Sequence, residues 1–261
     1  MTPDDFDRLQ NLMASRAGFR LTRDRMKLAE HRLGPVARRE GFETVDAMLA
    51  SLWAKPVASL GWAVIEALLN PETWFRRDRT SFDTLAGELL PALGKARAGQ
   101  PVRIWSAGCS TGQEAGVAVE IVATDLSQRA LEKARSGAYT GFEIQRGLKA
   151  ETMLRWFDQA EDAWIARAEL RAMVHFARAN LADAPTDDHR FDVIFCRHVL
   201  GDADPARRRD MFDNLERRLV DDGCLFLGPD EQPDGDSIAF RAVAGRKGLF
   251  VKSTAALRRA A

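Results

Sequence analysis

A loop rich in glycine and serine, and an acid that ends the next apolar run, are the residues of this chain best suited to hold a ligand. The apolar run 102–106 leads into Ala107–Gly112 (AGCSTG), and the β-branched run 119–125 ends on Asp125. Glycine has no side chain, so backbone amides in such a loop can approach a ligand closely. An acid after the next strand suits the two hydroxyls of a ribose. A tight turn alone would also explain the two glycines. The spacing therefore leaves both interpretations open, a ligand-binding loop and a simple turn.

Several other kinds of site are disfavoured by what the sequence lacks. It contains neither the dinucleotide pattern G-x-G-x-x-G nor the P-loop pattern G-x-x-x-x-G-K-[ST], which disfavours nicotinamide oxidoreductases and nucleotide triphosphatases. The three cysteines, Cys109, Cys196 and Cys224, are scattered and form no C-x-x-C pair. They fit reduced thiols better than a disulfide framework or a zinc site, and we expect no metal.

A second cluster of chemically useful side chains spans Pro71–Asp78 (PETWFRRD). It combines aromatic, acidic and basic groups and lies between a helical region and a region of strands. Its composition fits an interdomain hinge as well as a lid over a ligand, and the sequence alone does not separate the two.

The elements that must position these groups fall into two regions. In the first seventy residues Phe6 and Leu9 repeat at helical spacing, and a helix is expected from Thr22, a suitable N-cap, to Glu40. Pro35 predicts a kink or break within that helix. From residue 101 onward, apolar strands alternate with helices, which indicates a mostly parallel, doubly wound α/β sheet with both faces covered. Strands are expected at 102–106, 119–125, 174–176, 191–196 and 224–228, helices at 126–136 and 204–219, and a C-terminal antiparallel hairpin at 240–243 and 249–252.

Bulk properties exclude some partners. The 261 residues carry 38 basic and 38 acidic side chains, so the formal charge is zero and no nucleic-acid footprint is indicated. The basic run Arg207–Arg209 has acids beside it and is best explained as a solvated helix face. No window approaches the ~18 apolar residues of a membrane span, and the acidic N-terminus is unlike a signal peptide. We therefore expect a cytoplasmic protein without membrane insertion, and a monomer.

The order of motifs resembles the chemotaxis-receptor glutamate O-methyltransferases of the CheR type over nearly the whole chain. Glu72–Asp78 (ETWFRRD) is similar to the family's E-T-x-F-F-R-D, and Ile104–Glu114 (IWSAGCSTGQE) to its W-S-A-x-x-S-T-G-x-E. The other matching motifs are Ile121–Ser127 (IVATDLS), Asn180-Leu181 and Phe191–Arg197 (FDVIFCR), with Gly18-Phe19 and Arg32-Leu33 in the helical part.

This resemblance implies S-adenosylmethionine as cofactor, S-adenosylhomocysteine as product, and glutamate side chains on the cytoplasmic helices of a chemoreceptor as acceptors. It implies a small all-α N-terminal domain at 1–70, a linker and cofactor-lid segment at 71–100, and the cofactor-binding α/β domain at 101–261, with room for a small β-subdomain at 158–176. The implied cofactor contacts are Thr73, Arg77 and Glu114 at the methionine end, Gly108 and Ser110 in the glycine loop, Asp125 at the ribose, Asn180 and Leu181 around the adenine, and Arg197 and His198 at the near wall.

Such a transfer needs few catalytic groups. A carboxylate is already ionised at pH 7 and the sulfonium carbon is already activated, so positioning and exclusion of water suffice without a general base. Arg77 is our candidate catalytic residue, because a guanidinium can orient a carboxylate through two hydrogen bonds. A plain ion pair of Arg77 with Asp78 or Glu72 is the alternative.

Several differences from the family pattern bear on activity. Only twelve residues separate Ser106 from Val119, whereas neighbouring parallel strands normally need a longer crossover with a helix. We expect either deletion of the family's helix after Glu114 or omission of a segment from the sequence, and favour omission. Asp202 stands where the family has a tyrosine near the reacting methyl group, and would repel a substrate carboxylate if it pointed inward.

The remaining differences are smaller. Pro71 stands where many members have asparagine, Arg76 replaces a phenylalanine, and His198 replaces an asparagine, an exchange that could preserve hydrogen bonding. The turn 158–163 contains no glycine, so we do not expect a receptor tail peptide to dock there.

Two alternatives to an active glutamate methyltransferase follow. One is a degenerate relative that binds cofactor or receptor without turnover, favoured by Asp202 and the short crossover. The other is a small-molecule methyltransferase on the same core, which the resemblance of the helical part disfavours.

Overall fold

The computed structural model describes residues 1–261 except 71, 74, 110–118, 234–238 and 254–261. Two compact units divide the chain. The first, the helical unit, comprises Met1–Pro71 together with Asp202–Arg208, and the second, the sheet unit, comprises Glu72–Gly201 with Arg209–Ala261. The short segment Asp202–Arg208 is thus distant in sequence from the helices with which it packs.

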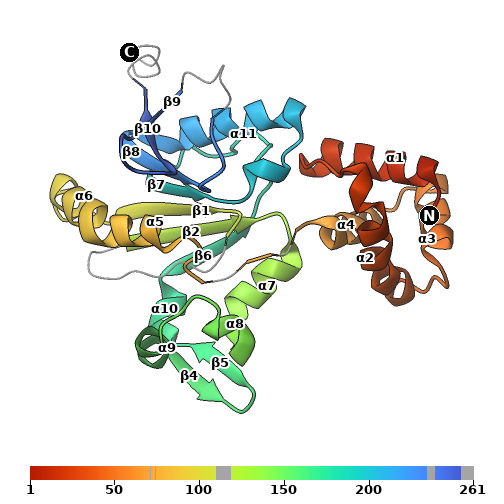
Figure 1. The fold of residues 1–261 in the computed structure, drawn as a ribbon, viewed down its shortest axis with the longest axis horizontal. Helices are drawn as coiled ribbons and strands as arrows, with labels where there is room; N and C mark the ends of the chain where they lie inside the picture. Colours follow the sequence, from red (N-terminus) through yellow and green to blue (C-terminus); the bar gives the residue numbers. More distant parts are fainter. Residues whose placement is uncertain (71, 74, 110–118, 234–238, 254–261) are drawn as a thin grey trace. The chain divides into compact units, whose positions relative to one another are not determined.

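The helical unit is built from α1 (Pro3–Leu12), α2 (Met26–Arg39), α3 (Val45–Ala54) and α4 (Ala58–Leu68), with short helical turns at Met13–Ala17 and Arg23–Arg25 (Figure 1). Thr2 and Asp5 form a reciprocal capping box that satisfies backbone donors at the start of α1. Of the kink or break expected at Pro35, the break is wrong, because α2 continues from Met26 to Arg39. The kink stays a prediction. Leu33 and Val36, on either side of the proline, are both buried and anchor the helix in the core.

Asp202 belongs to the helical unit and is held by a cation. Its carboxylate lies 3.1 Å from an Nη of Arg25, and its backbone carbonyl accepts a hydrogen bond of 2.8 Å from the amide of Arg20. Ala203 adds an antiparallel bridge to Phe19. Asp202 therefore has a nearby compensating charge, which weakens the electrostatic objection to an acid at this position.

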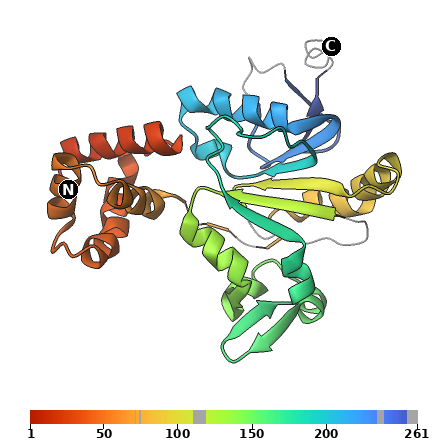
Figure 2. The same cartoon turned by 180° about the vertical axis from the view of Figure 1, so that it is seen from behind.

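The sheet unit contains a seven-stranded sheet in the order β6-β2-β1-β7-β8-β10-β9 (Figures 1 and 2). Its strands are β1 (Val102–Ala107), β2 (Val119–Asp125), β6 (Val174–Arg178), β7 (Phe191–Cys196), β8 (Leu219–Leu227), β9 (Phe240–Ala242) and β10 (Leu249–Lys252). The first five of these pair in parallel, and β10 runs antiparallel to β8 and β9. The predicted fold class, a mostly parallel α/β sheet with a C-terminal antiparallel hairpin after an N-terminal helical region, is confirmed.

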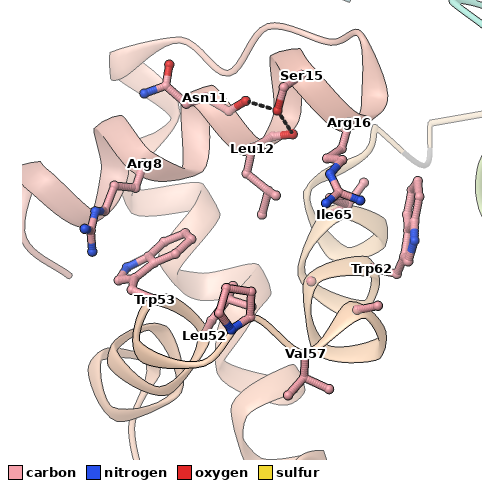
Figure 3. Close-up of a pocket in the computed structure, with 13 residues that line it drawn as sticks. Arg8, Asn11, Leu12, Ser15, Arg16, Leu52, Trp53, Val57, Trp62 and Ile65 are labelled. Carbon is pink, nitrogen blue, oxygen red and sulfur yellow. Dashed lines mark hydrogen bonds between the residues drawn. The ribbon is translucent and has the colours of Figure 1, made fainter.

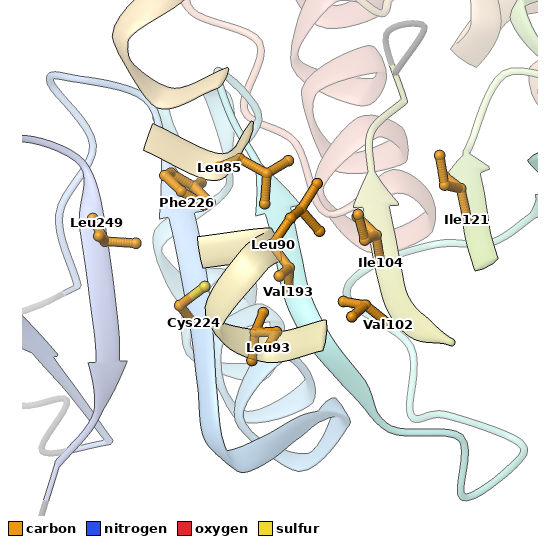
Figure 4. Close-up of a cluster of buried hydrophobic side chains, with 10 residues drawn as sticks. All are labelled: Leu85, Leu90, Leu93, Val102, Ile104, Ile121, Val193, Cys224, Phe226 and Leu249. Atoms are coloured by element: carbon orange, nitrogen blue, oxygen red, sulfur yellow. The ribbon is translucent and has the colours of Figure 1, made fainter. Parts of the chain in front are cut away.

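A helical segment that the sequence did not predict covers part of the sheet. It consists of α5 (Arg79–Thr84), a π-helical turn at Leu85–Leu89 and α6 (Leu90–Ala96). Leu85, Leu90 and Leu93 pack against apolar side chains of the sheet (Figure 4). Their partners on the strands are Val102, Ile104, Ile121, Val193, Cys224, Phe226 and Leu249. Two further helices of the fold are α7 (Gln128–Ser136) and α11 (Pro205–Arg218).

A small antiparallel sheet, in the order β3-β5-β4, lies apart from the main one. It comprises β3 (Ala138–Thr140), β4 (Phe157–Ala160) and β5 (Ala163–Ala166), with short helices α8 (Gly141–Gln145), α9 (Ala150–Trp156) and α10 (Ala168–Ala172). Phe75, Ile144, Phe157 and Ala166 form its buried core. Within the segment 158–176, β5 belongs to this sheet, whereas β6 joins the main sheet.

A buried acid joins the amino-terminal ends of β1 and β7. Asp192 is 2% exposed and accepts a hydrogen bond of 2.6 Å from Nε of Arg97 and one of 2.7 Å from the amide of Arg103. Arg97 also donates two hydrogen bonds of 2.8 Å to Asp222, and these two acids raise the pKa of the guanidinium. The network ties α6, β1, β7 and β8 together at the end of the sheet opposite the predicted ligand loop.

Candidate functional site

The carboxyl ends of β1, β2 and β6 are joined by backbone hydrogen bonds, which brings three predicted site residues to one edge. The amides of Gly108 and Cys109 donate to the carbonyl of Thr124 at 2.8 and 3.0 Å. The amide of Ala179 donates to the carbonyl of Asp125 at 3.1 Å. Gly108, Asp125 and Asn180 therefore lie on adjacent strand ends, where α/β sheets bind their ligands.

A buried side-chain hydrogen bond locks two of the sequence motifs together. Nε1 of Trp105, from the motif that ends in the glycine loop, donates at 2.9 Å to Oγ1 of Thr124, which precedes Asp125. Both side chains are buried, so the donor and the acceptor each depend on the other. The bond fixes the position of the glycine loop relative to Asp125. Sequence reasoning missed it, because nothing local shows that the two side chains face each other.

The left-handed backbone of Gly108, with φ of 74°, allows the loop after β7 to approach closely. A Cβ at this position would lie 2.4 Å from Cγ2 of Val199, far inside contact distance. Glycine is therefore required here on two grounds, its positive φ and the close neighbour.

The carboxylate of Asp125 ends β2 and is partly exposed. Its Oδ1 accepts a hydrogen bond of 2.8 Å from the amide of Ser127, which orients the side chain at the start of α7. A partly exposed, oriented carboxylate beside a glycine loop fits a pair of ribose hydroxyls, which are hydrogen-bond donors.

The loop after β6 is held by a residue that the sequence did not single out. Asn214, on α11 and 5% exposed, donates from Nδ2 to the carbonyls of Leu181 and Asp183 at 2.9 and 2.8 Å. Oδ1 of Asn180 accepts from the amide of Ala182 at 3.1 Å. Asn180 and Leu181 are thus placed beside Asp125 by a side chain more than thirty residues away in sequence.

Asp78 contacts two predicted site residues, Arg197 and His198, in the loop after β7. The guanidinium of Arg197 donates to the carboxylate of Asp78 and to the carbonyl of Arg77, and Nε2 of His198 lies 2.8 Å from Oδ2 of Asp78. Arg197 has 8% of its side chain exposed and lies over the ring of Phe82 at 5.6 Å. Burial lowers the pKa of Arg197, and the charge of Asp78 opposes that change. We call Asp78, Arg197 and His198 the clasp.

Strained backbone occurs in the clasp and next to it. Asp78 and His198 in the clasp, and the nearby Arg76, have φ of 55°, 59° and 49°, which is the left-handed region that few residues other than glycine adopt. Asparagine, aspartate and histidine tolerate it best, which explains why histidine can replace the family's asparagine at position 198. Three such residues in one cluster indicate a geometry maintained by its surroundings rather than by local preference.

Some of the other predicted site residues are described by the structure and some are not. Thr73 is exposed, and Glu72 lies 3.5 Å from Arg146 in an ion pair. Arg77 is partly buried and follows Arg76, which pairs with Asp83 at 2.6 Å. Pro71, Ser110 and Glu114 lie outside the described residues. The individual cofactor contacts stay predictions.

The short connection between β1 and β2 is compatible with the observed sheet. The two strands pair in parallel from Val102↔Val119 to Ala107↔Thr124. Residues 108–118 link them, of which 110–118 lie outside the described residues, and a stretch of eleven residues reaches at most about 36–40 Å when extended. Returning along a six-residue strand needs only about 17 Å. Parallel pairing of β1 and β2 therefore does not require a crossover helix. Comparison of the intact mass with the encoding DNA decides whether the family's helix after Glu114 is deleted or a segment is omitted from the sequence.

The thiol beside the loop is expected to be unreactive. Burial, and secondarily the charge of Asp125, raises the pKa of Cys109 to about 12, and burial raises that of Cys224 to about 12. At pH 8 only roughly one Cys109 thiol in ten thousand is then the nucleophilic thiolate. Iodoacetamide should label the native protein far more slowly than the unfolded protein, as mass spectrometry of the Cys109 peptide would show. Labelling of native Cys109 at the rate of free cysteine would contradict this.

The described residues contain neither a cluster of metal ligands nor a membrane-spanning helix. Across the parts of the chain that the structure describes, no three His, Cys, Asp or Glu side chains gather in a way that could hold a metal ion. No helix among these residues is long and apolar enough to cross a membrane.

The sequence of this chain matches the model of a known methyltransferase family. Residues 71–249 match the family model described as CheR methyltransferase, SAM binding domain. Chemotaxis protein methyltransferase Cher2 of Pseudomonas putida is 29% identical over 95% of this chain and 98% of its own length. Chemotaxis protein methyltransferase 1 of Pseudomonas aeruginosa is 31% identical over 87% of this chain and 89% of its own.

Solved structures show only a weaker likeness. A TehB-like SAM-dependent methyltransferase from Corynebacterium glutamicum aligns with a TM-score of 0.37 and 17% identity, over 67% of this chain and 99% of the other. The family match spans well over half of the chain and includes both the clasp and the strand-end edge. The chain therefore belongs to the CheR methyltransferase family and is a methyltransferase that uses S-adenosylmethionine.

Proposed function

We propose that this protein transfers the methyl group of S-adenosylmethionine to glutamate side chains on the cytoplasmic helices of a chemoreceptor, forming glutamate methyl esters in sensory adaptation. The observation that carries the proposal is the clasp. Through Asp78 it ties Phe75–Asp78 to Arg197 and His198, which follow β7. Gly108 lies against Val199 in that same loop, and Phe75 lines a pocket with Ser106 and Cys109 at the carboxyl end of β1. The likeness to chemotaxis protein methyltransferases supports the acceptor class.

The residues of the edge fit this cofactor. Gly108 has no side chain to obstruct a ligand at the end of β1, while its amide donates to the carbonyl of Thr124. Asp125 presents a partly exposed carboxylate at the neighbouring strand end. S-adenosylmethionine supplies a methyl group that its positively charged sulfur has already activated. The protein then has to bind, to orient and to exclude water. Arg77 is the group we propose for orienting the glutamate carboxylate, since a guanidinium fork matches both of its oxygens. The clasp holds the backbone carbonyl of Arg77 in place through Arg197.

Transfer of a labelled methyl group to purified chemoreceptor cytoplasmic fragments tests the proposal. The expected result is label on glutamate that base releases as methanol, and its loss in the variant Asp125→Ala. Binding of S-adenosylhomocysteine without any transfer would instead favour the non-catalytic relative. Label found only in added small molecules would favour a small-molecule methyltransferase.

The helical unit contains a groove. One face of α1 and of the helical turn Met13–Ala17 forms one wall, and the end of α3 with the first turns of α4 forms the other, around a cavity of about 430 Å³ (Figure 3). Leu12, Leu52 and Ile65 give it an apolar lining. Arg8 and Trp53 lie at one end and Arg16 and Trp62 at the other (Figure 3).

Each end of the groove carries an arginine. The guanidinium of Arg8 lies over the ring of Trp53 at 5.4 Å and 3.8 Å from the carboxylate of Asp4, and Nε1 of Trp53 donates to Oδ1 of Asp5 at 2.9 Å. Among the residues that line the groove there is no acid. A helix with an apolar stripe and flanking glutamates complements this surface in shape and in charge. We propose that the groove docks such a helix of the receptor.

Neutralising the arginines should weaken receptor binding alone. For Arg8→Gln with Arg16→Gln, the KM for receptor fragment is expected to rise about tenfold, because each rim contact contributes about 0.5–1 kcal/mol. The affinity for S-adenosylhomocysteine should not change. The matched control is Arg38→Gln with Arg39→Gln, an equal charge change at exposed positions of α2 outside the groove. An equal rise in KM for both double variants would show a general charge effect and contradict groove docking.

A further inference from the structure

A buried carboxylate outside the predicted site holds the loop that carries the clasp. Glu231 follows β8 and is 7% exposed. Its Oε2 accepts hydrogen bonds of 2.7 Å from the amides of both His198 and Gly228, and its Oε1 accepts one of 3.0 Å from the amide of Gly201. One side chain thus joins the loop after β7 to the end of β8.

These three bonds suit an ionised carboxylate. All three donors are backbone amides, and a carboxylate is the side-chain group that only accepts. Hydrogen bonds to an ionised group are about twice as strong as neutral ones. In glutamine, one of the two oxygens is replaced by an amide NH2 group, which would face a backbone N–H. One hydrogen bond would then be lost, and the two donors would repel each other.

The surroundings are shaped to admit this carboxylate. A Cβ on Gly228 would lie 2.7 Å from Oε2 of Glu231 and 3.2 Å from Nδ1 of His198. Only glycine at position 228 therefore leaves room for both side chains. The amide of Glu231 itself donates to the carbonyl of Gly228 at 3.0 Å, which fixes the tight turn from which the side chain reaches back.

The bonds act where the backbone is strained. His198 has φ of 59°, and a hydrogen bond to its own amide holds it there. In this conformation Nε2 of His198 reaches Asp78, and the neighbouring Arg197 reaches Asp78 and Arg77. Without the carboxylate, nothing else described here accepts from the amide of His198, and the loop would relax toward an ordinary conformation.

We propose that Glu231 is a positioning residue of the methyl transfer: it holds Arg197 and His198 in the geometry that closes the clasp on Asp78, and so keeps Phe75–Asp78 beside the cofactor edge. The role in catalysis rests on the proposed function. The role in cofactor binding does not, since it concerns affinity for the cofactor alone.

The test is a double-variant cycle on cofactor affinity. Calorimetry with S-adenosylhomocysteine should show Glu231→Gln weakening binding at least about tenfold, the effect of losing a charged hydrogen bond. Asp78→Asn should weaken it as well. If Glu231 acts through the clasp, the double variant should be no more than about threefold weaker than the worse single variant. Losses that multiply would overturn the proposal.

Hydrogen exchange separates positioning from general stability. In Glu231→Gln, the amides of His198 and Gly201 should exchange at least about tenfold faster, while amides of β1 and β7 keep their protection. The matched control is Asp230→Asn, because Asp230 is the adjacent acid, 94% exposed, 3.6 Å from Lys247. It should leave both affinity and exchange unchanged. Faster exchange throughout the sheet, or unchanged affinity in Glu231→Gln, would overturn the proposal. Neither readout needs a receptor, so a failure of methyl transfer would be recognised separately.

Discussion

Replacing Asp192 by asparagine is expected to destabilise the sheet unit by about 2–3 kcal/mol, the cost of leaving a buried donor without its acceptor. Asp192 is 2% exposed and accepts from Nε of Arg97 at 2.6 Å and from the amide of Arg103 at 2.7 Å. Asparagine has nearly the same shape, but its amide group would face one of these donors. The neighbouring guanidinium would also lose its buried counter-charge.

The matched variant is Asp222→Asn, which removes the other carboxylate on the same arginine. Asp222 is 62% exposed, so water replaces its hydrogen bonds and its loss should cost less than about 1 kcal/mol. Both acids pair with Arg97 through charged hydrogen bonds, so the contrast measures what burial and the bond from the amide of Arg103 add at Asp192.

The measurement must follow the sheet unit by itself, because two units need not unfold in one transition. Native-state hydrogen exchange of peptides from β1 and β7 reports the local free energy of opening. Equal losses of protection in the two variants would contradict the prediction.

The second large effect is expected at Gly108. Alanine there should weaken binding of S-adenosylhomocysteine by about 30-fold or more, equivalent to about 2 kcal/mol. The backbone has φ of 74°, and the new Cβ would lie 2.4 Å from Cγ2 of Val199. A left-handed alanine costs about 1–2 kcal/mol, and overpacking costs about 1–3 kcal/mol. The protein can avoid the clash only by moving the glycine loop or the loop after β7, and both belong to the proposed site.

A second substitution separates the two causes. Val199→Ala removes the methyl group that the new Cβ meets, and by itself should leave affinity within about threefold because Val199 is only partly buried. Combined with Gly108→Ala, it should recover the share of the loss that comes from the clash, but not the share that comes from φ. No recovery at all would show that contact with Val199 does not matter.

Local patterns in the sequence determined the architecture and the approximate place of the site. Apolar runs bounded by glycine and acids marked the parallel strands, because a buried strand needs apolar side chains along its whole length. The ends of those runs placed Gly108, Asp125 and Asn180 at the same edge of the sheet. The covering segment α5–α6 was not predicted, although Phe82, Leu85, Leu89 and Leu93 repeat at helical spacing. The strand β3 was not predicted either, because three residues are too few to show a period.

Only the tertiary structure decided how the site is held. Trp105 and Thr124, Asn214 and Leu181, and Glu231 and His198 are each separated by 19 to 33 positions along the chain. No periodicity links such residues, because their meeting depends on which strands become neighbours. The same holds for Asp202, which pairs with Arg25 across 177 positions. The sequence showed an unpaired acid at this position, whereas the structure gives its charge a partner. The sequence thus determined which groups reach the strand ends, and the packing determined which of them are fixed, paired or strained.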